Sequence, residues 1–255
     1  DFIVTSSLRE LPIESVFARG QCIAEHGKLL TDCPHYPWPS TVRETVKLGK
    51  KLKANDFTIS APEGISSVKA KVIGVIENQA PTKSLEFDLP VEEGNVQITE
   101  GVSYLALVER HRGTGSVTNG FVSGFGYTGS MAIASSVAHD SHHMIVVGTD
   151  RKLMAAAANR LGEVGGGVTL WKDDAERALV ELPIAGLMSD SQAAQVANKA
   201  QAIISAMIDC GCSLNNAYMQ HTLLALVVIP ELRISDLGLV DVNRFELTEV
   251  ISPES

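Results

Sequence analysis

The feature that most constrains the fold is a long series of short, strand-like segments that begins at Val68. These segments are rich in β-branched or aromatic residues, and glycines separate several of them, which is typical of β-strands bounded by turns. They lie at residues 68–77, 84–89, 102–109, 120–125, 131–137, 144–148, 168–171 and 178–182, and the tail adds strand-like runs at 223–229 and 245–251. The main part of the chain is therefore predicted to form a large β-sheet.

Two helices are predicted to pack on this sheet. Asp150 is a good N-cap for the first helix, which buries Leu153 and is expected to end at Gly162. The second helix is expected at about residues 191–210, where apolar side chains such as Ile203 recur at helical spacing. Two strand-then-helix units beside several hairpins indicate an α+β fold, in which a mixed β-sheet carries its helices on one face.

The sequence divides into three regions. Residues 1–30 alternate short apolar runs with turns such as Arg19-Gly20, which predicts a small β-meander. A few isolated strands are marginal in water, so we expect the meander to pack on something else. Residues 31–66 contain four prolines and are predicted to be a Pro-rich linker with one short helical piece. Residues 67–255 then form the α+β domain.

Composition excludes some partners. A formal net charge of −9 disfavours nucleic acid, whose recognition depends on clusters of Lys and Arg. The longest apolar run, residues 223–230, is far shorter than the roughly 20 residues of a membrane-spanning helix. The first residues contain no basic leader, so we expect a cytoplasmic protein without a membrane partner. The cysteines, Cys22, Cys33, Cys210 and Cys212, are expected to be reduced thiols.

The densest polar segment spans residues 135–143 and lies between two apolar strands. Within it, His139, Asp140 and His142 supply imidazole and carboxylate groups that suit Mn, Fe or Zn. These three residues are therefore candidates for a loop that contributes to a catalytic site. The alternative is that the histidines cap strand ends and hydrogen-bond to backbone groups.

A second polar cluster, Glu109, Arg110 and His111, is followed by glycines. A cationic loop beside glycines is suited to an anionic or carbonyl group. Together with Ser135 and Ser136, these residues are candidates for substrate binding. The alternative, which we favour for the second cluster, is a hairpin end with a surface ion pair.

An ordered series of motifs resembles the C-terminal domain of bacterial adenine deaminases, which belong to the amidohydrolase superfamily. The motifs are Glu109-Arg-His-Arg-Gly-Thr-Gly, Gly120-Phe-Val-Ser-Gly-Phe-Gly, Ala132-Ile-Ala-Ser-Ser-Val-Ala-His-Asp-Ser-His, Leu182-Pro-Ile-Ala-Gly-Leu-Met-Ser-Asp, Leu226-Val-Val-Ile-Pro-Glu-Leu-Arg and Gly238-Leu-Val-Asp. Residues 1–30 also resemble the strands that follow the barrel in such enzymes and complete a small β-domain. The family usually has Asn where this chain has His143, so no role is carried onto that residue.

The resemblance implies hydrolytic deamination of adenine to hypoxanthine and ammonia by water activated on Mn²⁺ or Fe²⁺. It also implies that most metal ligands lie on a (β/α)8 barrel N-terminal to this region, within a homo-oligomeric enzyme of purine metabolism. This chain contains no His-x-His pair, so we expect no complete metal site and little activity from it alone. His139, Asp140 and His142 are then expected to close over, or lend polar groups to, a purine site on the barrel.

Two other interpretations remain open. One is a standalone, non-catalytic binding or regulatory module with the same fold. The other is an independent metallohydrolase that uses the loop at 139–142 together with His111. This last interpretation requires the chain alone to bind about one equivalent of metal.

Overall fold

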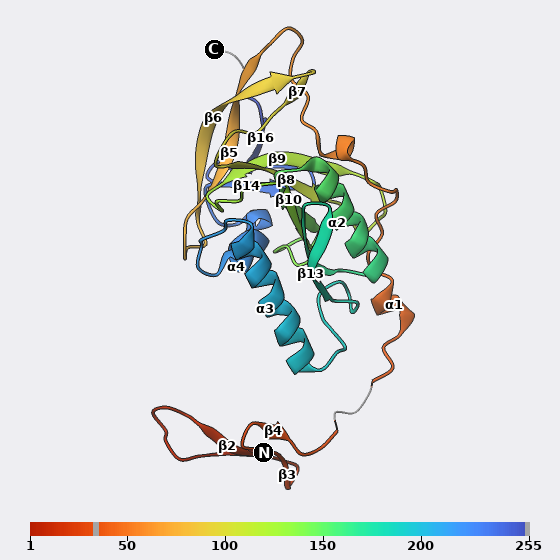
Figure 1. The fold of residues 1–255 in the computed structure, drawn as a ribbon, viewed down its shortest axis with the longest axis vertical. Coiled ribbons are helices and arrows are strands. Elements are labelled where there is room, and N and C mark those ends of the chain that lie inside the picture. Colours follow the sequence, from red (N-terminus) through yellow and green to blue (C-terminus); the bar gives the residue numbers. More distant parts are fainter. Residues whose placement is uncertain (33–35, 253–255) are drawn as a thin grey trace. The chain divides into compact units, whose positions relative to one another are not determined.

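The computed structural model describes residues 1–32 and 36–252. The chain divides into two compact units, residues 1–38 and residues 39–255. The first unit is a four-stranded antiparallel meander in the order β1-β2-β3-β4 (Figure 1). Its strands are β1 (Phe2–Thr5), β2 (Ile13–Ala18), β3 (Gln21–Glu25) and β4 (Lys28–Leu29). The predicted turn at Arg19-Gly20 joins β2 to β3.

The meander has no interior of its own. None of residues 1–32 falls in the buried class. Phe2 and Phe17 stack across β1 and β2 with ring centroids 4.6 Å apart, yet Phe2, Ile3 and Ile13 remain 57%, 50% and 53% exposed. A sheet of short strands with no buried side chain and this much exposed apolar surface needs a partner to be stable in water.

The second unit is built on a nine-stranded sheet in the order β13-β12-β10-β11-β8-β9-β5-β6-β7. Its strands are β5 (Ser67–Val75), β6 (Thr82–Glu92), β7 (Asn95–Val96), β8 (Val102–Val108), β9 (Val117–Ser123), β10 (Met131–Ser135), β11 (Met144–Gly148), β12 (Gly167–Lys172) and β13 (Ala175–Glu181). β5 and β9 pair in parallel, whereas the other strand pairs of the described sheet are antiparallel. The predicted α+β fold with a mixed sheet is confirmed.

The central strands are buried on both faces because successive side chains point in opposite directions. All seven residues of β8 are buried. Leu105 and Leu107 belong to one core cluster, while Tyr104 and Ala106 belong to the other. The sheet therefore separates two hydrophobic layers, and other elements must shield each layer from water.

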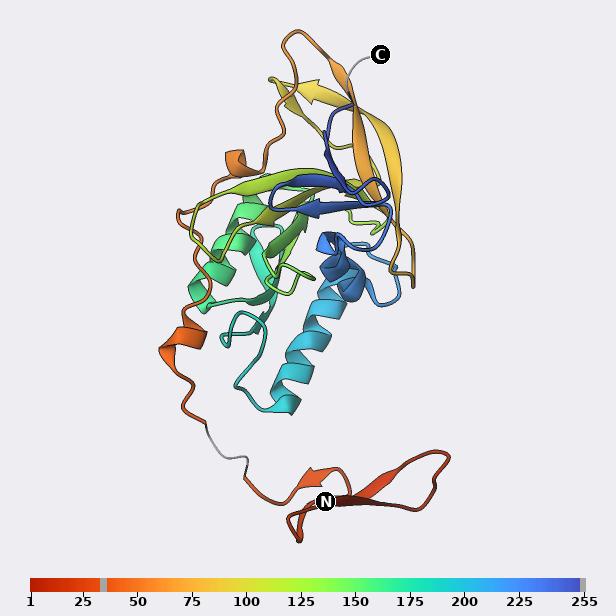
Figure 2. The ribbon, with the colours of Figure 1, turned by 180° about the vertical axis from the view of Figure 1, so that it is seen from behind.

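Helices cover both layers. The α-helices are α1 (Ser40–Arg43), α2 (Arg151–Val164), α3 (Ala193–Asp209) and α4 (Ala217–Thr222), and the 3₁₀ helices are η1 (Ala54–Phe57) and η2 (Leu223–Ala225). Leu153 of α2 packs in one core cluster and Ile203 of α3 packs in the other. α2 and α3 thus lie on opposite sides of the sheet (Figures 1 and 2). The prediction that the helices share one face is wrong.

The start of α2 is as predicted, but its end is not. The Asp150 carboxylate accepts hydrogen bonds from the N–H groups of the first turn, as an N-cap does. The helix continues past Gly162 to Val164, and Gly165 forms the left-handed C-cap with φ of 80°. A Cβ at Gly162 would lie 2.6 Å from Leu48 Cδ1, so this glycine makes room for a packed side chain instead of ending the helix.

The predicted strand at residues 223–229 is also wrong. This segment contains η2 followed by turns. The buried guanidinium of Arg233 binds carbonyl groups of this segment, because Nη1 donates to Leu223 O and Nε donates to Ile229 O, both over 2.8 Å. Those carbonyls are therefore not available to a neighbouring strand.

A three-stranded antiparallel sheet, β14-β15-β16, completes the second unit (Figure 2). Its strands are β14 (Leu232–Ser235), β15 (Gly238–Asp241) and β16 (Glu246–Thr248). Ile234 and Leu239 belong to the same core cluster as α3. The hairpin turn between β14 and β15 consequently lies against the main sheet, where Thr118 Oγ1 donates to Asp236 O over 3.0 Å.

Residues 39–66 run along the second unit. Leu52 and Phe57 are 3% and 1% exposed and belong to the core cluster beneath α2. Asn159 of α2 holds this segment through hydrogen bonds to both backbone groups of Leu52.

Two further predictions concern the cysteine thiols and the absence of a membrane-spanning helix. Cys22, Cys210 and Cys212 are free thiols, whereas Cys33 lies outside the described residues. Among the helices of the described residues, none is both long enough and apolar enough to span a membrane.

Candidate functional site

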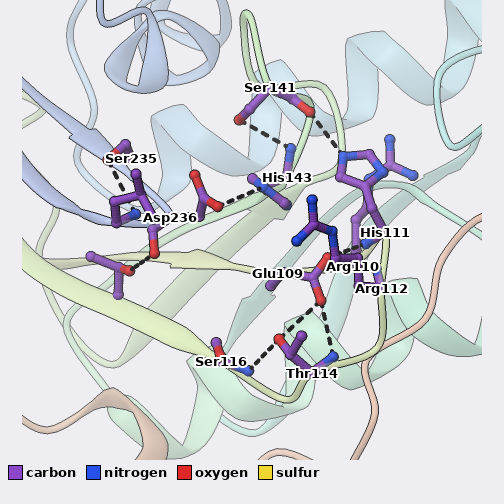
Figure 3. A network of polar contacts seen from close by, with 12 residues as sticks. Glu109, Arg110, His111, Arg112, Thr114, Ser116, Ser141, His143, Ser235 and Asp236 are labelled. Carbon is purple, nitrogen blue, oxygen red and sulfur yellow. Dashed lines mark hydrogen bonds and ion pairs between the residues drawn. The ribbon is translucent and has the colours of Figure 1, made fainter.

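Two polar loops come together at one end of the central strands. The first, residues 109–116, joins β8 to β9, and the second, residues 136–143, joins β10 to β11. β11 pairs with β8 in a register that places Met144 opposite Val108. The sheet thereby brings the two predicted clusters side by side (Figure 3).

Glu109 organises the first loop. Its carboxylate accepts hydrogen bonds from the backbone N–H groups of His111, Arg112 and Thr114 over 2.5, 2.7 and 3.0 Å, and from Thr114 Oγ1 over 3.0 Å. Burial alone would raise the pKa of Glu109, but the hydrogen bonds from Thr114, Arg112 and His111 outweigh it and lower the pKa to about 2. The carboxylate thus binds backbone groups of its own loop instead of forming the expected surface ion pair.

Arg110 links the two loops from inside the protein. It is 1% exposed, and its Nε donates to His142 O over 2.5 Å while Nη2 donates to Ala185 O over 3.2 Å. A third, longer hydrogen bond of 3.5 Å joins Nη1 to Thr45 O. Burial lowers the pKa of Arg110 to about 10, an effect opposed by the neighbouring Glu109, so the side chain is still a cation at neutral pH.

His111 and His143 meet where the loops touch. Their ring centroids lie 4.7 Å apart, with the planes tilted by 55°. His111 Nε2 lies 2.9 Å from Ser141 O, and His143 Nε2 lies 3.6 Å from Asp236 Oδ2 (Figure 3). Burial lowers the pKa of His143, and Asp236 opposes this effect.

The three loop residues predicted to be catalytic lie at the surface of this arrangement. Asp140 is exposed, whereas His139 and His142 are partly buried. The two imidazole rings stand edge to face with centroids 5.3 Å apart. The backbone beneath them is tied to the end of α4, because His139 N donates to Thr222 O over 3.0 Å. Burial, with a smaller effect of His139, lowers the pKa of His142.

The two serines lie beneath the loop and are fully buried. Ser136 Oγ accepts from Gly167 N over 2.7 Å and donates to Gly186 O over 2.6 Å. Ser135 Oγ lies 3.0 Å from Val137 O and 3.3 Å from the Tyr218 hydroxyl. These hydroxyl groups hold the base of the loop, and neither is presented to solvent.

The side chains available as metal ligands can be compared with the Mn²⁺ or Fe²⁺ site that the sequence resemblance implies. Among the residues that the structure describes, no group of three or more His, Cys, Asp or Glu side chains is arranged to hold a metal ion. The Glu109 carboxylate is used by its own loop, and the paired rings of His139 and His142 provide at most two nitrogen ligands. The described residues therefore do not fit a complete Mn²⁺ or Fe²⁺ site.

Several residues of this site escaped the sequence analysis. Asp236 lies 93 positions after His143 in the sequence, in a hairpin turn that only tertiary packing brings to the loops. Thr222 and Tyr218 likewise come from segments without a recognisable motif, and the motif that begins at Leu182 does not indicate that Ala185 O accepts from Arg110. The one available signal was the position of Asp236 beside a Leu-Gly turn, which indicates a turn but not its neighbour.

Known proteins resemble this chain over most of its length. The family described as adenine deaminase C-terminal domain matches residues 79–246. Proteins named adenine deaminase from Ruegeria pomeroyi and Roseobacter denitrificans are 68% and 69% identical to the chain over 99% and 98% of its length. A protein of the same name from Moorella thermoacetica is 40% identical over 99% of the chain. In each case the match covers 42% of the relative.

The chain therefore belongs to the adenine deaminase C-terminal domain family, as its motifs indicated. It spans about two fifths of the length of the curated relatives that it matches, so it corresponds to one part of a longer enzyme in those organisms.

Proposed function

We propose that this chain is the C-terminal part of an adenine deaminase and that its loop at residues 139–142 contributes polar groups to the purine site of the whole enzyme. In that reaction adenine and water give hypoxanthine and ammonia. The names of the relatives support the substrate. The metal-activated water and most of its ligands would belong to the part of the parent enzyme that this chain does not include.

The observation that carries this proposal is a polar loop whose backbone is hydrogen-bonded from below. Arg110 binds His142 O, His111 contacts Ser141 O, and Thr222 O accepts from His139 N. The backbone is thus anchored at three successive places while Asp140 stays exposed. Side chains on a fixed backbone can orient a substrate at low entropic cost, which is what a site-closing loop requires.

The chemistry of the loop fits this role. His139 and His142 offer nitrogen atoms that donate or accept hydrogen bonds, and a purine presents both kinds of group on its ring edge. The lowered pKa of His142 keeps its imidazole neutral near pH 7, so it retains one accepting nitrogen. Departure of ammonia also requires a proton donor, a function that a histidine loop can serve.

The first compact unit supports the requirement for a partner. Its meander leaves Phe2, Ile3 and Ile13 at least half exposed. We propose that the N-terminal part of the parent enzyme completes this sheet into a β-domain. The native metal (manganese or iron), the homo-oligomeric state and the cytoplasmic location of the enzyme remain predictions from the sequence.

The test uses the full-length parent enzyme with His139→Ala, His142→Ala and Asp140→Asn. We expect kcat/KM for adenine to fall by about 10-fold or more in at least the histidine variants, as general acid–base and orienting groups typically contribute that much. Bound metal is quantified in each variant to separate a role in substrate handling from a role in metal retention.

Glu163→Gln is the matched control, because Glu163 is an exposed residue on α2 whose carboxylate pairs with Arg160 at the surface. Its activity should equal that of the unmodified enzyme. Unchanged turnover and unchanged metal content in both histidine variants would contradict the proposed role of the loop.

A further inference from the structure

His143 is the one histidine of the loop that is buried, and it faces a carboxylate from a distant hairpin. Its side chain is 9% exposed, and its Nε2 lies 3.6 Å from Asp236 Oδ2. Asp236 occupies the turn between β14 and β15, where Thr118 fixes its backbone oxygen. A carboxylate at this distance favours the tautomer that carries the proton on Nε2.

The other ring nitrogen has an unusual environment. His143 Nδ1 is buried and has no hydrogen-bond partner among the described residues. Burying a polar atom without a hydrogen-bond partner costs free energy. The ring of His143 is nevertheless buried at this position. The neighbouring group is His111, whose ring centroid is 4.7 Å away and whose Nε2 contacts Ser141 O.

These contacts form a continuous chain from the hairpin to the loop: Asp236 contacts His143, His143 contacts His111, and His111 contacts Ser141 (Figure 3). Ser141 also contacts His143 directly, because its Oγ accepts a hydrogen bond from His143 N over 3.4 Å. Asp236 and His111 both contact His143, which directly follows His142. His111 also contacts Ser141, which lies between Asp140 and His142. The orientation of the loop is thus coupled to the position of the β14–β15 turn.

We propose that His143, oriented by Asp236, is a positioning residue that sets the geometry of the loop at residues 139–142. This inference rests on the proposed function of that loop. His143 acts through His111 and Ser141 and does not itself touch the substrate.

The charged and titratable groups around His143 are consistent with a positioning role. Burial lowers its pKa; Asp236 and Glu109 oppose this, whereas His111 and Arg110 reinforce it. The imidazole is therefore neutral near pH 7, and its Nε2 faces the Asp236 carboxylate across 3.6 Å. A donor of the same reach should replace it, whereas an apolar group of similar volume should not.

The test compares His143→Gln with His143→Leu in the full-length parent enzyme. The Gln amide nitrogen reaches about as far as imidazole Nε2 and can donate to Asp236, whereas Leu fills the space without a donor. We expect the Leu variant to lose about 10-fold in kcat/KM for adenine, as loss of an orienting partner typically does, and the Gln variant to keep most of the activity. Thermal unfolding measured in parallel separates this effect from loss of folded enzyme.

A double-mutant cycle with Asp236→Asn identifies the partner. If Asp236 acts through His143, the losses of Asp236→Asn and His143→Leu should not multiply in the double variant. Asp241→Asn, at the other end of β15, is the control and should leave kcat/KM unchanged. Equal losses for Gln and Leu, multiplicative losses in the cycle, or no loss in His143→Leu would each overturn the inference.

The two proposals fail in different ways. If His139→Ala and His142→Ala impair the enzyme but the His143 and Asp236 variants show no coupling, only the positioning role is wrong. If the His139 and His142 variants leave turnover and metal content unchanged, the proposed function of the loop is wrong, and the positioning role is wrong with it.

Discussion

The guanidinium of Arg110 donates a hydrogen bond from Nε to the backbone oxygen of His142 over 2.5 Å. This contact joins the loop between β8 and β9 to the loop between β10 and β11 and is shielded from water, since Arg110 is 1% exposed. A charged donor shared among several backbone oxygens fixes loops that regular secondary structure does not reach. The shape of the candidate site thus depends on a residue that is not at its surface.

Arg110→Lys should therefore disturb the site although the charge is kept. An ammonium group cannot replace the planar fork, so at least one buried carbonyl is left without a partner, at a cost of about 1–3 kcal/mol. We expect the parent enzyme to lose thermal stability and kcat/KM for adenine together. Arg112→Lys, at an exposed position of the same loop, is the control; equal behaviour of the two variants would contradict this role.

Glu109 should make the chain sensitive to acid. Its pKa is lowered from 4.5 to about 2 in the folded state, so the unfolded state binds the proton more readily. The resulting stabilisation is fully present above about pH 4.5 and is lost as the pH falls toward about 2.

Urea unfolding of the 255-residue chain between pH 7 and pH 3 tests this prediction. Glu109→Gln should be less stable at pH 7 and should show a flatter dependence on pH below 4.5. Glu163→Gln, on the exposed side of α2, should retain the steep dependence. A Glu109→Gln variant with unchanged stability at pH 7 would show that the carboxylate does not hold the loop.

His221 should add a second acid dependence at higher pH. It is fully buried, neither ring nitrogen has a partner among the described residues, and burial lowers its pKa to about 3. Because the folded-state pKa lies below the usual 6.5, the associated stability is complete above about pH 6.5 and declines toward about pH 3. The slope contributed by one such group approaches 1.4 kcal/mol per pH unit.

His221→Leu should remove that slope, so the unfolding free energy between pH 6.5 and pH 4.5 becomes less dependent on pH. His26→Leu, at an exposed turn, should leave the slope in place. The same slope in His221→Leu as in the unmodified chain would mean that His221 is protonated as easily in the folded as in the unfolded state.

The packing of α3 gives a matched pair of neighbouring residues. Ile203 is 3% exposed and belongs to the core, whereas Ile204 is 45% exposed. Ile203→Ala should lower the free energy of unfolding by about 2–5 kcal/mol because it leaves a cavity, while Ile204→Ala should change it much less. Similar losses, measured by chemical denaturation, would contradict the assignment of the buried face.

Much of this fold could be predicted from local sequence. Strands such as β8 and β11 are mostly apolar runs, and the N-cap at Asp150 is a short-range signal that the structure confirms. The parallel pairing of β5 with β9 and the opposite placement of α2 and α3 depend on contacts between distant segments. Local periodicity contains no information about those contacts.

The candidate site was predictable to a similar extent. The sequence indicated two polar clusters, and the pairing of β11 with β8 explains why they are neighbours. It did not indicate that the Glu109 carboxylate would bind its own loop, since this requires three N–H groups to converge in a turn. The contact between His143 and Asp236 was also out of reach, because no motif links a loop to a hairpin so far along the chain.

The most direct test of the central claim is adenine deamination by this 255-residue chain alone, followed by ultraviolet absorbance, first metal-free and then with added Mn²⁺ or Fe²⁺, with bound metal quantified alongside. Because the described residues do not form a complete metal site, we expect no turnover and no stoichiometric metal. Metal-dependent turnover with about one equivalent of bound metal would contradict the claim that this chain works only as part of a longer enzyme.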